Sequence, residues 1–169
     1  MHVQGFLYEY NRGDRNFSGV ILHNADLSNC NLSGINLSHA DLSGANLSGA
    51  NLTRANLKYA NLKSANLTDA DFSGAHLEGG NLTGAVLKGA TLLGSNLIRA
   101  DLRSTDLEAA DLRGANLSDT TVDSANLQPA HRSGACAEGG DLVGANLTDA
   151  AAEAIAEDTV AVASRTACC

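Results

Sequence analysis

The chain has 169 residues, which is enough for one domain, and it carries a formal net charge of −8. Its N-terminus lacks a charged region followed by an apolar stretch, and no run approaches about 18 apolar residues. We therefore expect a cytoplasmic protein that has no membrane partner. The acidic balance argues against direct binding to nucleic acid, which needs Lys and Arg gathered on one face.

The first expected element lies within residues 1–14, which we interpret as an N-terminal cap. Val3, Phe6, Leu7 and Tyr10 follow one another at the spacing of a single helical face. The repeats that come next are expected to stack as coils, and a stack of coils has unpaired backbone groups at its ends. A short amphipathic helix over the first coil covers these groups in this interpretation.

Residues 15–149 repeat with a period of five residues. The stretch DLSGANLSGANLTRANLKYANLKSANLTDADFSGA, from Asp41 to Ala75, has Leu at every fifth position and one Phe at the end. If this large residue is taken as the centre of each pentapeptide, 27 centres run from Phe17 to Leu147, and Leu fills 22 of them. Ala lies two residues before the centre in 18 pentapeptides, and Asn or Asp lies just before it in 20. Such regularity predicts one continuous structure.

Neither regular element can use this period. Five residues advance about 500° on a helix, and an odd spacing sends successive residues to opposite faces of a strand. A chain that turns a corner in every pentapeptide points all centres to one axis, with the small residue close to neighbouring backbone and Asn, Asp and Gly at the turns. The predicted structural core includes Leu57, Leu62, Leu67 and Phe72 in one coil, with Ala60 at a small inward position.

The motif A-(N/D)-L-x-x, as in ANLSG, ANLTR, ADLRG and ANLTD, resembles the pentapeptide-repeat proteins over roughly residues 15–150. The stretch YNRGDRNFSGVILHNADLS is similar to the start of many cyanobacterial members. The resemblance implies an all-β fold, a right-handed quadrilateral β-helix with four pentapeptides per coil. At four per coil, the 27 pentapeptides give about seven coils.

Two later segments depart from the repeat. Residues 128–140 hold the single proline and put Arg132 and Ala137 at centres, before the frame resumes at Leu142. This segment forms either a weak coil or a loop that bulges from the wall. Residues 150–169 are expected to be a helical or disordered tail that ends in Cys168 and Cys169. A homodimer that forms through this end of the coils is a further partner that the sequence allows.

The sequence does not predict an enzyme. Its five histidines lack the spacing of metal ligands, and its glycines belong to the turns rather than to a phosphate-binding loop. These histidines are His2, His23, His39, His76 and His131. Ser and Asp serve the turns, and no Ser lies in a nucleophile elbow. We therefore predict no catalytic residue, no cofactor and no metal site.

We predict a non-catalytic structural or protein-interaction module, although the sequence does not name the protein partner. Val86, Leu93 and Ile98 point outward on consecutive sides of about one coil, and they form a possible contact patch. Tyr59 is expected one coil beyond His39 on the same side, which makes this pair a second candidate.

The resemblance also implies an alternative function, because some pentapeptide-repeat proteins resemble a DNA duplex in size and charge and bind DNA gyrase. The acidic balance of the repeats favours this alternative, with 14 acidic and 9 basic residues between Arg15 and Asp149. However, residues 20 apart would stack, and no such column is an unbroken row of acids. One column reads Asp41, Asn61, Asn81, Asp101, Thr121 and Asp141. The interaction module is therefore the preferred prediction.

Overall fold

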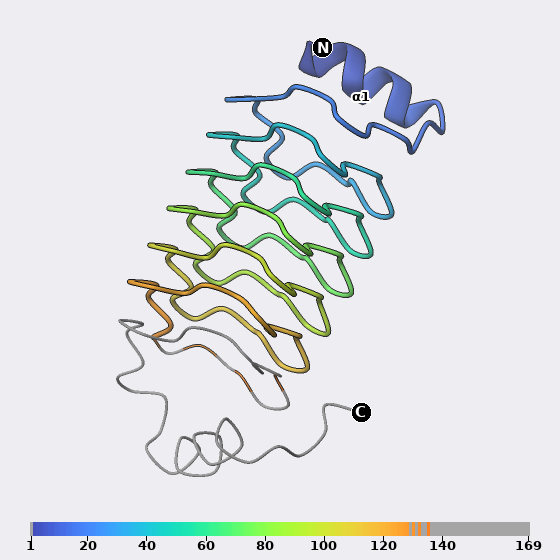
Figure 1. Ribbon diagram of the computed structural model, residues 1–169. Helices are drawn as coiled ribbons and strands as arrows, with labels where there is room; N and C mark the ends of the chain where they lie inside the picture. Colours follow the sequence, from blue (N-terminus) through green and yellow to red (C-terminus); the bar gives the residue numbers. More distant parts are fainter. Residues whose placement is uncertain (1, 129, 131, 133–134, 136–169) are drawn as a thin grey trace.

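The computed structural model describes residues 2–128, 130, 132 and 135. Within these residues the chain winds into a stack of coils (Figure 1). Parallel bridges join residues that are 20 apart, from Asn16–Asn36 to Asp106–Asn126. A shift of 20 residues corresponds to four pentapeptides, so each coil has four sides.

We name the four sides by their first centres. Side A begins with Phe17, side B with Leu22, side C with Leu27 and side D with Leu32, and each side continues at every twentieth residue. The extended pieces are single-residue bridges rather than long strands. Among the residues that the structure describes, α1 (Val3–Asn11) is the one helix, and it is too short to cross a membrane.

One pentapeptide, residues 40–44, shows how the backbone N–H groups are satisfied. Four of the five donate to backbone carbonyls: one at the preceding corner, one in the coil before and two in the coil after. These pairs are Ala40 to Leu37, Asp41 to Val20, Leu42 to Asn61 and Gly44 to Lys63, at 2.8–3.0 Å. The fifth N–H, that of Ser43, donates to Oδ1 of Asp41 at 3.1 Å. Each N–H of this unit therefore has a partner, as buried backbone requires.

An Asn or Asp before the centre has a specific structural role for this reason. Its side-chain oxygen accepts the backbone N–H two residues later, which is the one N–H of the pentapeptide that has no backbone carbonyl as a partner. Both Asn and Asp can do this. Asn has a second role because its Nδ2 group can donate to the residue one coil earlier. Asn61 donates in this way to Asp41 at 3.1 Å, and Asn126 donates to Asp106 at 2.9 Å. Asp has no equivalent donor.

The interior is filled by the centres and by the small residues two positions before them. Leu57, Leu62, Leu67 and Phe72 have no exposed surface, and neither does Ala60. Burying each of the large side chains is worth about 1.5–3 kcal/mol before the entropy of ordering the chain is subtracted. The leucine period is therefore the main source of stability in this fold.

Polar residues replace the small apolar residue at a few buried positions. Ser95, Thr105 and Thr120 are each 1% exposed. The hydroxyls of Thr105 and Thr120 donate at 2.7 Å to backbone carbonyls three residues earlier. The Ser95 hydroxyl is buried and has no hydrogen-bond partner within the part of the chain that the structure describes. An unpaired buried hydroxyl costs about 1–3 kcal/mol.

Helix α1 lies across the N-terminal end of the stack (Figure 1). Its residues Phe6 and Tyr10 are buried, and Val3 and Leu7 are partly buried against the core. These are the four residues whose spacing predicts a helical face. The helix therefore packs on the coils through the face that the sequence indicates.

Side-chain contacts fix α1 to the first coil. The Phe6 and Phe17 rings meet edge to face, with their centroids 4.7 Å apart. The Tyr10 hydroxyl donates to the Ser33 carbonyl at 3.0 Å. The Arg15 guanidinium donates to the Tyr10 carbonyl at 2.8 Å and lies 4.0 Å from the centroid of the Tyr10 ring. Aromatic packing and hydrogen bonds thus both hold the helix in place.

The last residue of each pentapeptide forms the corner and has a positive φ. Gly44 has φ +65°, but His39 and Tyr59 also adopt this conformation, at +59° and +58°. Gly enters this region without strain, whereas other residues pay roughly 1–2 kcal/mol. A side chain at a corner is therefore costly, and contacts between coils must offset that cost.

Most of the segment that departs from the repeat lies outside the described residues. Ala130 is buried at its inward position, and the Ala135 N–H donates to the Arg132 carbonyl at 2.9 Å. The alternatives predicted for residues 128–140, a weak coil or a loop, concern positions that fall mostly outside the described residues. The remaining centres up to Leu147 and the expected tail, residues 150–169, also lie outside the described residues.

Candidate functional site

The described part of the chain contains no group of three or more His, Cys, Asp or Glu side chains that could hold a metal ion. Three of the histidines lie on the repeat wall. His23 is on side B, His39 is at the corner after side A, and His76 is on side A. His2 precedes α1, and His131 lies outside the described residues. The structure does not gather the described histidines into one site.

The predicted apolar patch lies on three different sides of the rod. Val86 is on side C and is 38% exposed, whereas Leu93 is on side D and is 45% exposed. Ile98, on side A, is only half-buried rather than fully exposed. One flat partner surface cannot contact three sides of a rod at the same time. These residues are therefore separate candidate contacts rather than a single patch.

Acidic residues at the position before the centre are never stacked in the described coils. These are Asp26, Asp41, Asp71, Asp101, Asp106 and Asp111, and their bridge partners are Asn, Thr, Ile or Val. Like charges that face each other on neighbouring strands destabilise a sheet by roughly 0.2–1 kcal/mol. The alternation of Asp with uncharged residues avoids this repulsion, and it also breaks every acidic column.

Arginines neutralise part of the remaining negative charge. Asp101 accepts hydrogen bonds from Arg103, whose Nη2 lies 2.6 Å from Oδ2. Asp111 pairs with Arg113 in the same geometry, also at 2.6 Å. The hydrogen bonds from the Arg103 side chain lower the pKa of the Asp101 carboxyl. A guanidinium therefore compensates part of the negative charge at each of the two carboxylates.

Most cations of the wall are also paired with acids. Seven Lys and Arg residues lie between residues 54 and 113, and five of them form ion pairs. Apart from the two arginines above, the pairs are Lys58–Glu78 at 3.2 Å, Lys88–Glu108 at 2.9 Å and Arg99–Asp119 at 3.6 Å. Arg54 and Lys63 form no ion pair with any residue that the structure describes. They are the free cations of this part of an acidic rod.

These two cations belong to the least acidic part of the repeats. Residues 42–68 contain no acid, and their charged residues are Arg54, Lys58 and Lys63. Arg54 is at the corner before side A, Lys58 is on side A and Lys63 is on side B, while Tyr59 is at the corner between these sides. We name Arg54, Lys58, Tyr59 and Lys63 the cationic belt. It runs around one coil across two sides of the rod.

Tyr59 is an aromatic side chain with 60% of its surface exposed. Its ring stacks on that of His39 in the preceding coil, with centroids 5.1 Å apart and an interplanar angle of 17°. The Cδ1–Cε1 edge of the ring lies close to Gly79, where an added Cβ would be only 2.5 Å from Cε1 of the tyrosine. The position of the Tyr59 ring therefore depends on a glycine in the next coil. The pairing of Tyr59 with His39 is the one that a 20-residue coil predicts.

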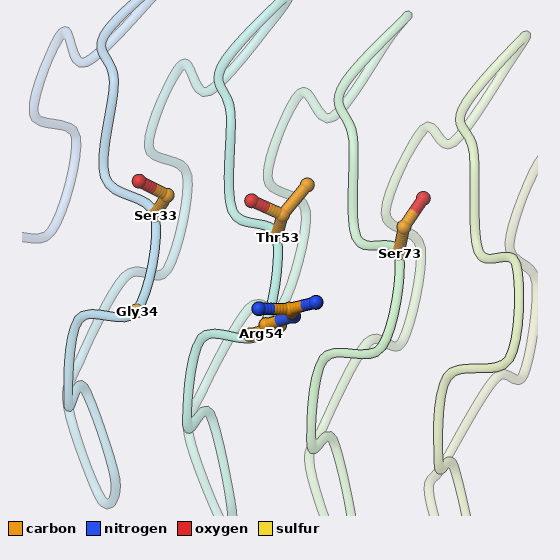
Figure 2. Close-up of a pocket in the computed structure, with 5 residues that line it drawn as sticks. All are labelled: Ser33, Gly34, Thr53, Arg54 and Ser73. Carbon is orange, nitrogen blue, oxygen red and sulfur yellow. The ribbon is translucent and has the colours of Figure 1, made fainter.

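A shallow depression of about 550 Å³ surrounds Arg54 (Figure 2). It is lined by Ser33, Gly34, Thr53, Arg54 and Ser73, which come from three successive coils. The residues that precede and follow Arg54 in its corner column are Gly34 and Gly74. Neither has a side chain that could cover the guanidinium. Arg54 is thus exposed and sterically accessible as well as free of an ion pair.

The sequence alone does not identify the belt as a site. Its lysines and arginines count there only toward the 9 basic residues between Arg15 and Asp149. The absence of acids from residues 42–68 is the signal that was visible in the sequence. Arg54 and Lys63 have no ion-pair partner among the described residues because of the residues that lie one coil away from them. The 20-residue register identifies those residues.

The model of one protein family, described as pentapeptide repeats, matches this chain in eight copies. The matched residues are 16–34, 30–69, 65–103 and 94–128. No curated protein matches the chain.

Several solved structures are similar to this one. HetL from the cyanobacterium Nostoc sp. PCC 7120, a pentapeptide-repeat protein involved in regulating heterocyst differentiation, is 27% identical, with 88% of this chain and 98% of HetL covered and a TM-score of 0.49. The pentapeptide-repeat protein alr5209 from Nostoc PCC 7120 is 32% identical, with 87% and 96% covered and a TM-score of 0.43. QnrB1, a plasmid-mediated fluoroquinolone-resistance protein, is 23% identical, with 87% and 93% covered and a TM-score of 0.47.

Proposed function

Since the chain belongs to the pentapeptide-repeat family, we propose that it is a non-catalytic interaction module whose outer wall binds a partner protein. The observation that carries this proposal is the filled interior. Centres such as Leu57 and small residues such as Ala60 are fully buried. Recognition is therefore left to the side chains of the wall, which repeat at the spacing of the coils.

In this proposal residues 15–149 form a right-handed β-helix of about seven coils. Residues 1–14 cap its first coil, and residues 150–169 are a helical or disordered tail. Phe6 and Tyr10 are the buried residues of α1, and their burial supports its role as a cap. The right-handed sense comes from the family, because a 20-residue register fixes the number of sides but not the hand.

The hydroxyls and carboxylates of the wall support a non-catalytic role. The Ser43 hydroxyl donates to Asp41 at 2.7 Å, and the Ser73 hydroxyl donates to Asp71 at 2.6 Å. A nucleophilic Ser requires instead a base that accepts its proton and a third group that orients the base. These hydroxyls are used to hold the corners of the coils, which is a structural task.

DNA mimicry with gyrase as the partner is the second candidate, and the acidic balance of the repeats is the observation that favours it. The distribution of charge argues against it, because Asp101 and Asp111 are paired with arginines and no Asp is stacked on another within the described coils. A gyrase supercoiling assay separates the two functions. The interaction module predicts no inhibition by micromolar protein, whereas mimicry predicts inhibition that weakens with salt and with Asp101→Asn, Asp106→Asn and Asp111→Asn.

The proposal itself is tested by photo-crosslinking in cells of the source organism. One photoreactive residue is placed on each side of the rod, at Lys58, Lys63, Lys88 or Leu93. We expect a discrete protein adduct from at least one side and none from an equivalent residue at the buried Leu57. Adducts that disappear after nuclease treatment, or no discrete adduct from any side, would contradict a protein-binding wall.

A further inference from the structure

We propose that the cationic belt is the docking surface of the rod and that it binds an acidic segment of the partner protein. This inference rests on the proposed function and adds the location and the chemistry of the contact. The occupant is a short stretch of chain rich in Asp and Glu, lying across side A and over the corner at Tyr59. Three features of the belt support it: its charge, the access to Arg54 and the exposed ring of Tyr59.

The charge of the belt is opposite to that of the remaining repeats. Residues 42–68 carry three cations and no acid, whereas acids outnumber bases over the repeats as a whole. Lys58 is 43% exposed although it pairs with Glu78, so its ammonium group can still meet an incoming carboxylate. Arg54 and Lys63 form no ion pair within the described residues. An acidic segment therefore supplies the partners that the rod itself does not.

Arg54 is the expected anchor of this contact. The planar guanidinium matches the geometry of a carboxylate and can donate two parallel hydrogen bonds to it. The depression around Arg54 has glycines at the adjacent corners, which leaves the guanidinium open to solvent (Figure 2). The Thr53 and Ser73 hydroxyls already donate to Asn51 and Asp71. They therefore offer lone pairs that can accept backbone N–H groups of the bound segment.

Tyr59 contributes apolar contact area beside these charges. Tyr and Arg are enriched among the residues that dominate binding energy at protein interfaces. The ring stacks on His39 and has its edge at Gly79, so little further side-chain entropy is lost when a partner packs against it. A rigid exposed ring between Lys58 and Lys63 suits a mixed polar and apolar contact.

The surroundings of the belt favour an acidic protein segment over a nucleic acid. Asp41 lies on side B in the coil before Lys63, while Asp71 and Glu78 lie beyond the belt on sides D and A. A nucleic acid strand carries a charge about every 3.4 Å and continues past the belt, where these carboxylates would repel it. A short acidic segment can end within the belt.

The test measures binding of the full chain to a short fluorescein-labelled peptide in which Glu alternates with Gly. Fluorescence anisotropy gives the Kd at low ionic strength and at about 0.15 M. We expect saturable binding that weakens with salt, and no binding of the same peptide with Gln in place of Glu. Arg54→Gln and Lys63→Gln should each weaken binding about two- to fivefold, the range of one exposed ion pair.

Lys88→Gln is the matched control, because it removes the same charge from side C, where Lys88 pairs with Glu108. We expect it to leave the Kd unchanged. Equal weakening by Lys88→Gln would show that only net charge matters and would overturn the belt. An oligonucleotide that binds more tightly than the peptide, with the same dependence on Arg54, would assign the belt to nucleic acid and also overturn the inference.

Failure of the belt can be distinguished from failure of the interaction module. If the peptide does not bind but photoreactive Lys88 or Leu93 captures a discrete protein, the docking surface lies on another side and the module stands. If no side captures a protein, the proposed function fails as well. Tyr59→Ala adds a check on the aromatic contact, because it should weaken peptide binding without changing its dependence on salt.

Discussion

The amide of Asn61 donates a hydrogen bond of 3.1 Å to Oδ1 of Asp41, which lies one coil earlier. The same oxygen accepts the backbone N–H of Ser43 at 3.1 Å and its hydroxyl at 2.7 Å. One carboxylate oxygen therefore joins the corner of its own coil to the next coil. This arrangement requires a hydrogen-bond donor at position 61, which Asn has and Asp lacks. Asn and Asp therefore have different roles at this position, although the repeat motif allows either.

Asn61→Asp places a carboxylate directly over that of Asp41. We expect a loss of about 1–2 kcal/mol in the free energy of unfolding, because a hydrogen bond is replaced by repulsion between like charges. Urea denaturation near neutral pH measures this change. Asn66→Asp is the control, since it loses the hydrogen bond to Asn46 but has Asn and Val as its bridge partners. Equal losses in the two variants would contradict the role assigned to charge.

The stability should fall at acidic pH in a way that depends on the corner aspartates. Hydrogen bonds from the Ser43 side chain and backbone lower the pKa of Asp41, and those from Ser28 lower the pKa of Asp26. A carboxyl whose pKa is lower in the folded state stabilises the fold above its unfolded pKa of about 3.9, and this contribution is lost as the pH falls through the folded value.

Urea denaturation at a series of pH values between about 5 and 3 measures this loss. Asp26→Asn combined with Asp41→Asn keeps an oxygen acceptor at each corner but removes the titrating group. We expect the double variant to lose less stability than the wild type over this range. An identical decline in both proteins would show that other groups control the acid sensitivity.

Leu67→Ala should cost about 2–5 kcal/mol in the free energy of unfolding, because the fully buried side chain leaves a cavity between coils. Lys63→Ala is the outward control on the preceding side, and we expect it to change stability by less than about 0.5 kcal/mol. Chemical denaturation followed by circular dichroism measures both values. Similar costs at the two positions would mean that the inward register is wrong.

Ser95→Ala should be neutral or stabilising by up to about 1 kcal/mol, because it removes a buried hydroxyl that has no partner among the described residues. Thr105→Ala should instead destabilise by about 1–2 kcal/mol, since it removes a hydrogen bond to the Leu102 carbonyl and a buried methyl group. Thermal unfolding of the two variants under the same conditions compares them. A loss of stability in Ser95→Ala would indicate that its hydroxyl is satisfied.

The sequence predicts the parts of the fold that depend on period. The spacing of Leu57, Leu62 and Leu67 predicts that they share an interior, and the 20-residue coil predicts that Tyr59 meets His39. The period alone does not set the number of sides, which came from the family resemblance. It also could not show which N–H the side chain of Asp41 accepts, because that depends on the geometry of the corner.

The candidate site was harder to predict because it depends on neighbours one coil away. Lys58 and Lys63 look equivalent in the sequence, yet the residue one coil later is Glu78 for the first and Thr83 for the second. Val86 and Leu93 are both outward, as predicted, but they lie on different sides of a four-sided rod. Outward direction follows from the repeat, whereas a shared surface requires the full register.

The cationic belt on the outer wall binds a partner protein, whereas the buried interior only supports the wall. The most direct measurement is the yield of the crosslinked protein adduct in cells for the wild type and for a variant combining Arg54→Gln, Tyr59→Ala and Lys63→Gln, each with the photoreactive residue at Lys58. We expect the variant to keep its free energy of unfolding within about 1 kcal/mol of the wild type and to lose most of the adduct. An undiminished adduct in a folded variant would contradict the account.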